Sequence, residues 1–378
     1  MIDFTLTDEM KDLQARARKF AQEEIEPIAA EYDRKGETPL FIVERAIEVG
    51  LMNLTIPKEY GGGGYNALIN CIVAEELAAG CAGIAITLMA NALALTPLIL
   101  FGSPQQKEEF LRPLCGEPKL SAFCLTERTA GSDAGSIKAT ALADSDDYVI
   151  NGVKCFITNG GIADLYTVFA LTNPEKGPRG ASAIVVPADT PGIEITKIED
   201  KMGQRASNTA EITFKDVRVP KKNLLGKEGQ GFRIALRTLD QARAGIGALS
   251  TGIARKALEL SLKYARERVQ FGKPIIEQQA IQFMLADMAI KIEAARLLTW
   301  KAAWLADQGQ KVTLASAMAK CYAADMAMEV TTDAVQIFGG YGYMRDYPME
   351  KLMRDAKLLQ IYEGTNQIQR LVIARNLK

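Results

Sequence analysis

The sequence contains no histidine at all. Histidine is the base of Ser-His-Asp and Cys-His catalytic sites and the commonest ligand of transition metals. Its absence excludes those two catalytic arrangements and removes that ligand. Any proton transfer must therefore be carried out by Asp, Glu, Lys, Tyr or Cys, and we expect no metal site.

Cysteine is scarce, with six residues at positions 71, 81, 115, 124, 155 and 321. None of them forms a CxxC pair or has the spacing of metal ligands. Reduced and mostly buried thiols in a cytosolic protein explain this pattern best. We therefore expect a cytoplasmic location.

An excess of charge of either sign is also missing, because 45 Lys and Arg residues are balanced by 46 Asp and Glu residues for a formal charge of -1. No stretch forms a basic block, so nucleic acid is not an expected partner. The N-terminal segment lacks the basic region and apolar core of a signal peptide. We expect the mature protein to start at Met1.

One long segment has no charged residue, between Glu76 and Lys107. We place its helix at about residues 84–95 and expect Pro97 to break it. This length falls short of the roughly 20 apolar residues that a membrane span requires. The sequence therefore predicts a helix buried in a soluble core, with no membrane insertion.

The first third of the chain has the apolar spacing of helices. Thr7 is a candidate cap for the first of them, and the predicted helical segments cover residues 7–32, 40–50, 67–79 and 84–95. The four glycines at positions 61–64 lack the following Gly-Lys-Ser/Thr of a phosphate loop, so we interpret them as a flexible turn.

From Leu120 to about residue 220 the chain changes to short β-rich runs, and Asn151-Gly152 is a strong signal for a two-residue hairpin. After Pro220, long helical patterns return and predict an antiparallel bundle. The sequence thus predicts an α+β protein. Its expected domains are an N-terminal all-α domain at 1–119, a middle antiparallel β-sheet or barrel at 120–221, and a C-terminal four-helix bundle at 222–378.

Glu363 is the candidate catalytic base. It follows the apolar residues Leu358, Leu359 and Ile361 and precedes Gly364, which can adopt backbone angles closed to other residues. A carboxylate held among apolar neighbours has a raised pKa, which suits proton abstraction. After this bend, Thr365 can cap a helix whose apolar side carries Ile368, Leu371 and Val372. The alternative is an ordinary solvated glutamate near a helix end.

Four further stretches could hold a ligand. They are the hydroxyl-rich loop at 124–133, the strand end at 156–161, the connection with two cations and an aromatic at 268–274, and the glycine-rich helix end at 336–343. Each also has an ordinary structural explanation, such as a turn, a core aromatic residue or a glycine helix cap. The glycines at 339–342 do not form GxGxxG after a strand, so they give no support to a nicotinamide-binding unit.

Taken together, these stretches resemble the acyl-CoA dehydrogenase family, FAD enzymes that introduce an α,β double bond into a fatty acyl-CoA thioester. The resemblance covers essentially the whole chain and is of the short-chain, butyryl-CoA dehydrogenase-like kind. The matching motifs are Leu125-Thr126-Glu127 with Ala130-Gly131-Ser132-Asp133, Phe156-Ile157-Thr158-Asn159-Gly160, Leu239-Asp240-Gln241-Ala242-Arg243, Arg268 with Phe271-Gly272-Lys273, Gln336-Ile337-Phe338-Gly339-Gly340, and Tyr362-Glu363-Gly364-Thr365.

The resemblance implies a mechanism. Glu363 removes the α-proton while a hydride leaves the β-carbon for flavin N5, which gives a 2-enoyl-CoA. During this step, the thioester carbonyl is polarised by the backbone N–H of Glu363 and by a flavin ribityl hydroxyl. Some relatives carry the base instead at the position of Ala242, which cannot serve here.

The resemblance also implies roles for other residues, with part of the FAD site crossing a subunit boundary. The isoalloxazine ring is expected near Thr126, Phe156 and Thr158; the rest of FAD near Ser132, Arg268, Phe271, Gln279, Gln336, Gly339, Gly340, Thr365 and Gln367; and acyl-CoA near Ser132, Leu239, Asp240, Arg243, Tyr362 and Gly364. Met89, Asn91, Leu95 and Leu239 are candidates to line the acyl tail.

The expected partners are a short-chain or alicyclic acyl-CoA thioester, electron-transferring flavoprotein as electron acceptor, and further copies of the chain in a homotetramer. The expected role is in fatty acid β-oxidation. Two alternatives remain: an enoyl-CoA reductase that runs the reaction in reverse, and a non-catalytic acyl-CoA binding scaffold. One departure from the family is Arg128-Thr129 in place of the usual proline, and its cation could contact flavin, CoA or the electron acceptor.

Overall fold

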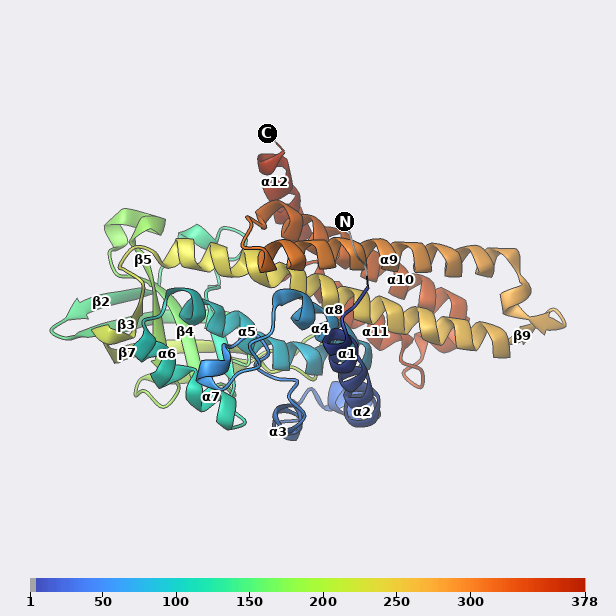
Figure 1. The fold of residues 1–378 in the computed structure, drawn as a ribbon, viewed down its shortest axis with the longest axis horizontal. Helices are drawn as coiled ribbons and strands as arrows, with labels where there is room; N and C mark the ends of the chain where they lie inside the picture. Colours follow the sequence, from blue (N-terminus) through green and yellow to red (C-terminus); the bar gives the residue numbers. More distant parts are fainter. Residues whose placement is uncertain (1–4, 378) are drawn as a thin grey trace.

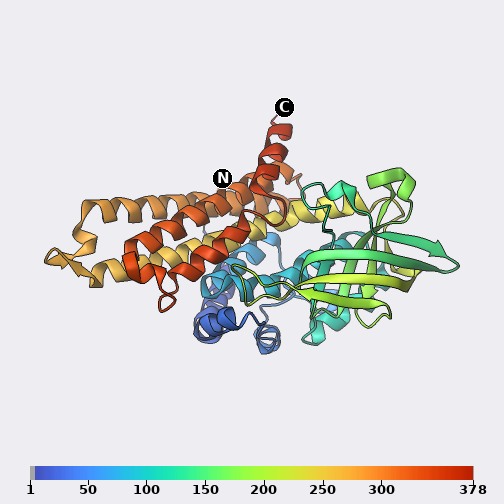
Figure 2. The same ribbon diagram turned by 180° about the vertical axis from the view of Figure 1, so that it is seen from behind.

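The computed structural model of the protein describes residues 5–377, so the expected start at Met1 lies outside the described residues. Helices come first along the chain, a β-sheet follows, and long helices complete it (Figure 1). The sheet occupies one end of the elongated molecule. The hairpin of β9 (Val269–Gln270) and β10 (Lys273–Pro274) lies at the opposite end (Figures 1 and 2).

The first region contains helices only. They are α1 (Asp8–Phe20), α2 (Glu26–Lys35), α3 (Phe41–Glu48), α4 (Ala67–Gly80), α5 (Ala82–Phe101), α6 (Pro104–Phe110) and α7 (Arg112–Gly116). The Thr7 hydroxyl oxygen accepts a hydrogen bond from the Met10 N–H, so the predicted cap is confirmed. The predicted single helix at 7–32 is α1 and α2 joined by a π-helical turn at Ala21–Ile25.

Helix α5 is longer than predicted, because Pro97 lies inside it instead of ending it. Pro97 and Leu98 are buried, and the Thr96 hydroxyl donates to the Ala92 carbonyl at 2.7 Å, so packing and this bond support the turn that proline disturbs. By length and hydropathy, Ala82–Phe101 meets the criteria for a membrane span, yet 61% of the tested window is buried within the protein. Burial of this extent is typical of a core helix.

The middle region is an eight-stranded sheet in the order β6-β7-β3-β2-β4-β5-β8, with β1 paired to β4. Its strands are β1 (Ser121–Cys124), β2 (Thr140–Asp144), β3 (Asp147–Thr158), β4 (Leu165–Leu171), β5 (Ala181–Pro187), β6 (Ile193–Ile198), β7 (Thr209–Pro220) and β8 (Leu224–Leu225). The sheet is mainly antiparallel, as predicted, although β4 pairs in parallel with β1 and, at one residue, with β2.

The prediction of a hairpin at Asn151-Gly152 is wrong. Both residues lie inside β3, where the register against β7 shifts between Ile150 and Gly152, which marks a bulge. The turn between β2 and β3 lies at Ser145 and Asp146 instead, and Ser145 has a φ of 53°. Pairing with β7 on both sides of the bulge therefore outweighs the local preference of Asn-Gly for a turn.

The last region begins with α8 (Gly231–Glu267), continues through the hairpin strands β9 (Val269–Gln270) and β10 (Lys273–Pro274), and ends with α9 (Gln279–Asp307), α10 (Thr313–Phe338), α11 (Met349–Leu359) and α12 (Asn366–Asn376). Close approach to α4 requires Gly252, because a Cβ there would lie 2.2 Å from the Glu75 carbonyl oxygen. A continuous core joins this bundle to the N-terminal helices, with Leu77 and Ile84 packed in one cluster with Leu249 and Ile253.

The end of the chain differs from prediction in one respect. Thr365 caps α12 as expected, with its hydroxyl oxygen 3.2 Å from the Ile368 nitrogen. The buried positions of α12 are the polar residues Asn366 and Gln369, however, whereas Leu371 is half exposed. Hydrogen bonds to α10 and to the preceding turn orient this helix, so Leu371 remains at the surface while Ile368 and Val372 are half buried.

Candidate functional site

Glu363 lies on a tight turn between α11 and α12. Its φ is 52° and that of Gly364 is 90°, so two successive residues have left-handed backbone angles. Glycine adopts such angles freely, whereas glutamate does so at a cost of about 1–3 kcal/mol. The Gln369 side-chain amide offsets part of this cost by donating to the carbonyls of Glu363 and Gly364 at 3.1 and 3.0 Å.

The Glu363 carboxyl group has the environment of a base. The residue retains partial exposure, but its Oε2 atom is buried and has no hydrogen-bond partner within the described part of the chain. Burial raises the pKa of Glu363 to about 7, and the positive charges of Arg243 and Lys320 partly oppose this rise. A carboxyl group with such a pKa can accept a proton near neutral pH.

Helix α8 supplies one of the two cations near this carboxyl group, Arg243. Arg243 is 4% exposed and donates to Asp240 at 2.5 Å, while its Nε atom is buried without a partner among the described residues. The other Asp240 oxygen accepts from the Thr313 hydroxyl at 2.6 Å. Leu239 is half buried against the core beneath the sheet. The arrangement brings a buried cation close to the carboxyl group of Glu363.

Helix α10 contributes a residue that the sequence reasoning missed. Lys320 has no exposed surface, and its Nζ donates to the Gly364 carbonyl at 2.9 Å and to Asn366 Oδ1 at 2.8 Å. Its signal in the sequence was a single charge within the otherwise uncharged run Leu314–Ala324. Tyr362 was predicted and lies beside Glu363, with a buried hydroxyl that has no partner in residues 5–377.

The sheet presents Phe156 and Thr158 at the end of β3. Phe156 is 65% exposed with a φ of 57°, so its ring lies on the surface and not in the core. Thr158 is half buried, and the carbonyl of the half-buried Thr126 accepts from the Cys155 N–H at 3.0 Å. An exposed aromatic ring next to two threonines is suited to contact a flat polar ligand.

A buried ion pair supports this loop. Lys154 has no exposed surface, and its Nζ lies 2.7 Å from Glu127 Oε1. Burial lowers the pKa of Lys154, and Glu127 opposes that effect. Arg128, which departs from the family pattern, forms two hydrogen bonds of 2.7 Å with Glu211 on β7. In this structure its cation is therefore engaged within the chain.

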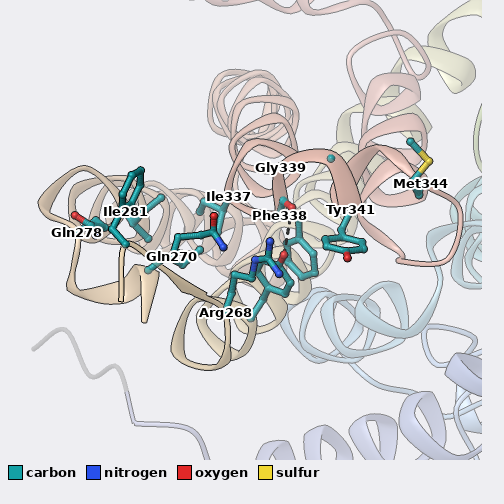
Figure 3. Close-up of a pocket in the computed structure, with 13 residues that line it drawn as sticks. Arg268, Gln270, Gln278, Ile281, Ile337, Phe338, Gly339, Tyr341 and Met344 are labelled. Atoms are coloured by element: carbon teal, nitrogen blue, oxygen red, sulfur yellow. Dashed lines mark hydrogen bonds between the residues drawn. The ribbon is translucent and has the colours of Figure 1, made fainter. Parts of the chain in front are cut away.

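A second candidate site is a cavity of about 700 Å³ at the β9–β10 end of the bundle (Figure 3). It brings together the predicted residues Arg268, Phe271, Gly339 and Gly340, which lie about 70 positions apart in the sequence. Arg268 lies over the Tyr341 ring at 5.5 Å. Gln278 lines the cavity, whereas the predicted Gln279 and Gln336 are not among its lining residues.

The two candidate sites are well separated within one chain. Asn366, next to the Glu363 turn, bonds to Cys321 on α10, whereas the cavity lies at Phe338, where α10 ends. These two residues of α10 are about 26 Å apart along a helix with a rise of 1.5 Å per residue. The remaining predicted residues, Ser132 and Gln367, are exposed.

The residues predicted to line an acyl tail have mixed surroundings. Met89 is half buried and faces Gly245 of α8. Leu95 is 1% exposed within the core beneath the sheet. Asn91 is completely buried, and its Oδ1 accepts from the Ser121 N–H at 2.7 Å, so its hydrogen-bonding capacity is used within the protein.

Comparison with known families explains why these features occur together. Residues 7–117 match the N-terminal domain of acyl-CoA dehydrogenase, residues 122–217 the middle domain, and residues 229–378 the C-terminal domain. The chain belongs to the acyl-CoA dehydrogenase family. Membership confirms the predicted fold, the predicted oxidoreductase class and FAD as the predicted cofactor.

Three similar proteins cover the full length of this member of the family. Acryloyl-CoA reductase (NADH) of Anaerotignum propionicum is 49% identical over 100% of this chain and 96% of its own. A chain from the structure of the electron transferring flavoprotein of Acidaminococcus fermentans is 48% identical with a TM-score of 0.98, over 100% of this chain and 99% of that one. Butyryl-CoA dehydrogenase of Megasphaera elsdenii is 46% identical with a TM-score of 0.97, over 100% of both chains.

Proposed function

We propose that this protein dehydrogenates a short-chain or alicyclic acyl-CoA thioester, with Glu363 as the base that removes the α-proton. The observation that carries this proposal is the Glu363 Oε2 atom, which is buried and lacks a hydrogen-bond partner among the described residues. Its raised pKa of about 7 suits a base that works near neutrality. The similarity to butyryl-CoA dehydrogenase supports a short acyl chain.

The residues of the turn have complementary tasks in this mechanism. When bound, FAD supplies the acceptor for the hydride that leaves the β-carbon. Glu363 takes the α-proton, and its own backbone N–H, which no carbonyl in residues 5–377 accepts, is available to polarise the thioester carbonyl. Arg243, fixed by Asp240, faces the carboxylate and favours its ionised form before the proton arrives.

The pH dependence of kcat/KM offers a direct test of this base, because it reports the pKa of the free enzyme. Because the ionised carboxylate is the active form, kcat/KM should fall as the pH drops through the pKa of about 7. We expect an acid limb near neutrality when kcat/KM is measured between about pH 5 and pH 9. A profile that stays flat down to about pH 5, as expected for an ordinary glutamate with a pKa of about 4.3, would show that burial does not tune this group as proposed.

The cavity fits the pyrophosphate and adenosine part of FAD. Arg268 offers a cation with a planar set of donors, the rings of Phe338 and Tyr341 offer flat surfaces, and the open space beside Gly339 and Gly340 allows close backbone approach. FAD bound at the Glu363 turn of one chain would reach this cavity in another chain, because the two sites are far apart within a single chain.

Arg268→Ala should weaken FAD binding by about 10- to 100-fold, since it removes charge-assisted hydrogen bonds to a phosphate. Retention of flavin during dialysis, followed by visible absorbance, measures this loss. Arg266→Ala is the matched control, because Arg266 is an exposed arginine at the same helix end and does not line the cavity. Equal flavin retention in both variants would remove Arg268 from the cofactor site.

Exposed apolar residues support assembly into a homo-oligomer, which we propose to be a tetramer. Phe283, Ile290, Leu297 and Trp304 recur every seventh position on α9 and are 40–67% exposed, and Phe271 is 94% exposed. A stripe of this kind is typical of a face covered by another helix. Light scattering of the purified protein would show a mass four times that of the chain, and a monomer would contradict the shared cofactor site.

Electron-transferring flavoprotein is the proposed acceptor, and its support is the similarity to the chain from the A. fermentans structure. We also propose a cytoplasmic location and a role in fatty acid β-oxidation.

A second function, enoyl-CoA reduction, is favoured by the 49% identity to acryloyl-CoA reductase. The same residues serve both directions, because a base that accepts the α-proton can also return it.

An anaerobic titration separates these functions. The purified protein is mixed with straight, branched and cyclic saturated acyl-CoA thioesters while the visible absorbance of the flavin is followed. Bleaching by a short straight or cyclic thioester supports the proposed dehydrogenase. An intact spectrum with every saturated thioester, together with reoxidation of the reduced protein by an enoyl-CoA, identifies a reductase. A colourless protein that binds acyl-CoA identifies a non-catalytic scaffold.

A further inference from the structure

Lys320 is a buried cation without a direct counter-ion. Its side chain has no exposed surface, and among the described residues it forms no ion pair. Burying an ammonium group is costly unless its hydrogen bonds are satisfied. The acceptors that satisfy it, the Gly364 carbonyl and Asn366 Oδ1, both belong to the turn that carries Glu363.

The turn itself needs such support. Glu363 and Gly364 both have left-handed backbone angles, and a strained conformation of this kind persists only where the surroundings determine it. Gln369 supports the turn from α12, and Lys320 supports it from α10. Asn366 is itself held by the Cys321 carbonyl and by Asp325, so the turn is tied to three residues of α10.

We propose that Lys320 is a positioning residue for Glu363, which fixes the direction of the carboxylate through the Gly364 carbonyl and faces that carboxylate with a positive charge. The proposal deepens the proposed function and rests on it. Lys320 does not touch the substrate in this mechanism. It acts on the reaction through the turn.

The charges around Glu363 determine the expected sign of the effect. Arg243 of α8 and Lys320 of α10 face the carboxyl group and lower its pKa against the effect of burial, while Tyr362 lies beside it in the turn. Asp240 is bonded to Arg243, and Asp325 of α10 is engaged by Asn366 and Arg370. Burial lowers the pKa of Lys320 to about 8, so the ammonium is mostly protonated at pH 7.

Lys320→Met removes both the hydrogen bonds and the charge. We expect kcat to fall about 10- to 100-fold with KM changed less than about threefold, because the turn loses its geometry while acyl-CoA binding elsewhere remains. We also expect the acid limb of the kcat/KM profile to move up by about one pH unit, since Glu363 loses a facing cation. A purely structural role would not move this limb.

Two further variants show whether the effect of Lys320→Met comes from the loss of the lysine charge and hydrogen bonds. Thr331→Val is the matched control, because Thr331 is fully buried on the same helix and its hydroxyl bonds only to carbonyls of α10. It should leave kcat and the acid limb unchanged. Lys320→Arg retains the charge and should lower kcat with a smaller shift of the limb than Lys320→Met. A Lys320→Met protein that is folded and flavin-replete but has an unchanged kcat and limb overturns the proposal.

A second readout does not depend on turnover. In flavin-loaded protein at about pH 7.5, where both Glu363 and Lys320 are mostly charged, the thermal midpoints of Lys320→Met, Glu363→Gln and the double variant form a double-mutant cycle. We expect a coupling between the two positions that disappears at pH 5, where Glu363 is protonated, and additive effects at both pH values would contradict it. Full activity in Glu363→Gln would instead refute the proposed base. The coupling between Lys320 and Glu363 would then be decided by the thermal midpoints alone.

Discussion

Glu363→Gln should lower the rate of acyl-CoA dehydrogenation by about a thousandfold while the protein remains folded and yellow. The amide has the shape of the carboxyl group but cannot accept a proton, and general bases contribute about 10²- to 10⁴-fold. The Oε2 atom that loses its basicity is the buried oxygen without a partner in the described structure. Steady-state turnover with an artificial electron acceptor measures the effect.

The matched control for this variant is Glu117→Gln. Glu117 is an exposed glutamate at the end of α7 that pairs with Lys119, far in sequence from the turn. The same amide substitution there should leave turnover within about twofold of the wild type, because an exposed ion pair contributes little. If Glu363→Gln were as active as Glu117→Gln, Glu363 would be excluded as the base, and the reaction would not use a carboxylate at this turn.

Glu127→Ala should destabilise the protein by about 3–5 kcal/mol, because it leaves the ammonium of Lys154 buried and unpaired. It also removes the acceptor of the Lys138 and Ala139 N–H groups, which lie 2.7 and 3.0 Å from the Glu127 carboxylate. The midpoint of urea unfolding at fixed protein concentration measures the loss. The loop with Thr126 should bind flavin more weakly in the same variant.

Two comparisons make the result specific to burial. The double variant Glu127→Leu with Lys154→Met removes both charges and should be less destabilised than Glu127→Ala. Arg128→Ala breaks the neighbouring pair with Glu211, in which the arginine side chain is 72% exposed and the glutamate side chain 8% exposed. Arg128→Ala should cost less than Glu127→Ala, because only one of its two partners is buried. Equal losses in Arg128→Ala and Glu127→Ala would show that the buried pair has no special importance.

The long helices of the bundle could be predicted because their apolar residues recur over about seven turns. The long helical patterns predicted after Pro220 correspond to α8, α9 and α10, and signals of that length are not easily outweighed by local context. The bend at Glu363 could be predicted for a local reason: Gly364 marks it, and this glycine has a φ of 90°.

Local signals failed where tertiary pairing decided the outcome. Asn151-Gly152 favours a turn, but β3 continues through it because β7 pairs with the strand on both sides of the bulge. Pro97 favours a helix end, but α5 continues because Pro97 and Leu98 are buried. In both cases the deciding partner lies far along the chain, where single-sequence patterns give no information.

Candidate site residues could be named one by one from the sequence, but their arrangement could not. Arg268 and Gly339 were both predicted, yet only the structure shows that they line one cavity with Phe338 and Tyr341. Lys320 was missed because a single lysine in an uncharged run has no characteristic spacing. Its role follows from bonds to Gly364 and Asn366, more than 40 positions away.

The most direct test of the central claim is anaerobic flavin reduction of the wild-type protein by butyryl-CoA carrying deuterium at the α-carbon or at the β-carbon. We expect deuterium at either carbon to slow bleaching at least about twofold, and deuterium at both carbons to slow it as well. The reason is that the base removes a proton from one carbon while the hydride acceptor removes a hydride from the adjacent one. The acid limb of this reduction should lie near the pKa of about 7 of Glu363. Bleaching without an isotope effect at the α-carbon in the wild type, with the same rate in Glu363→Gln, would contradict proton abstraction by Glu363.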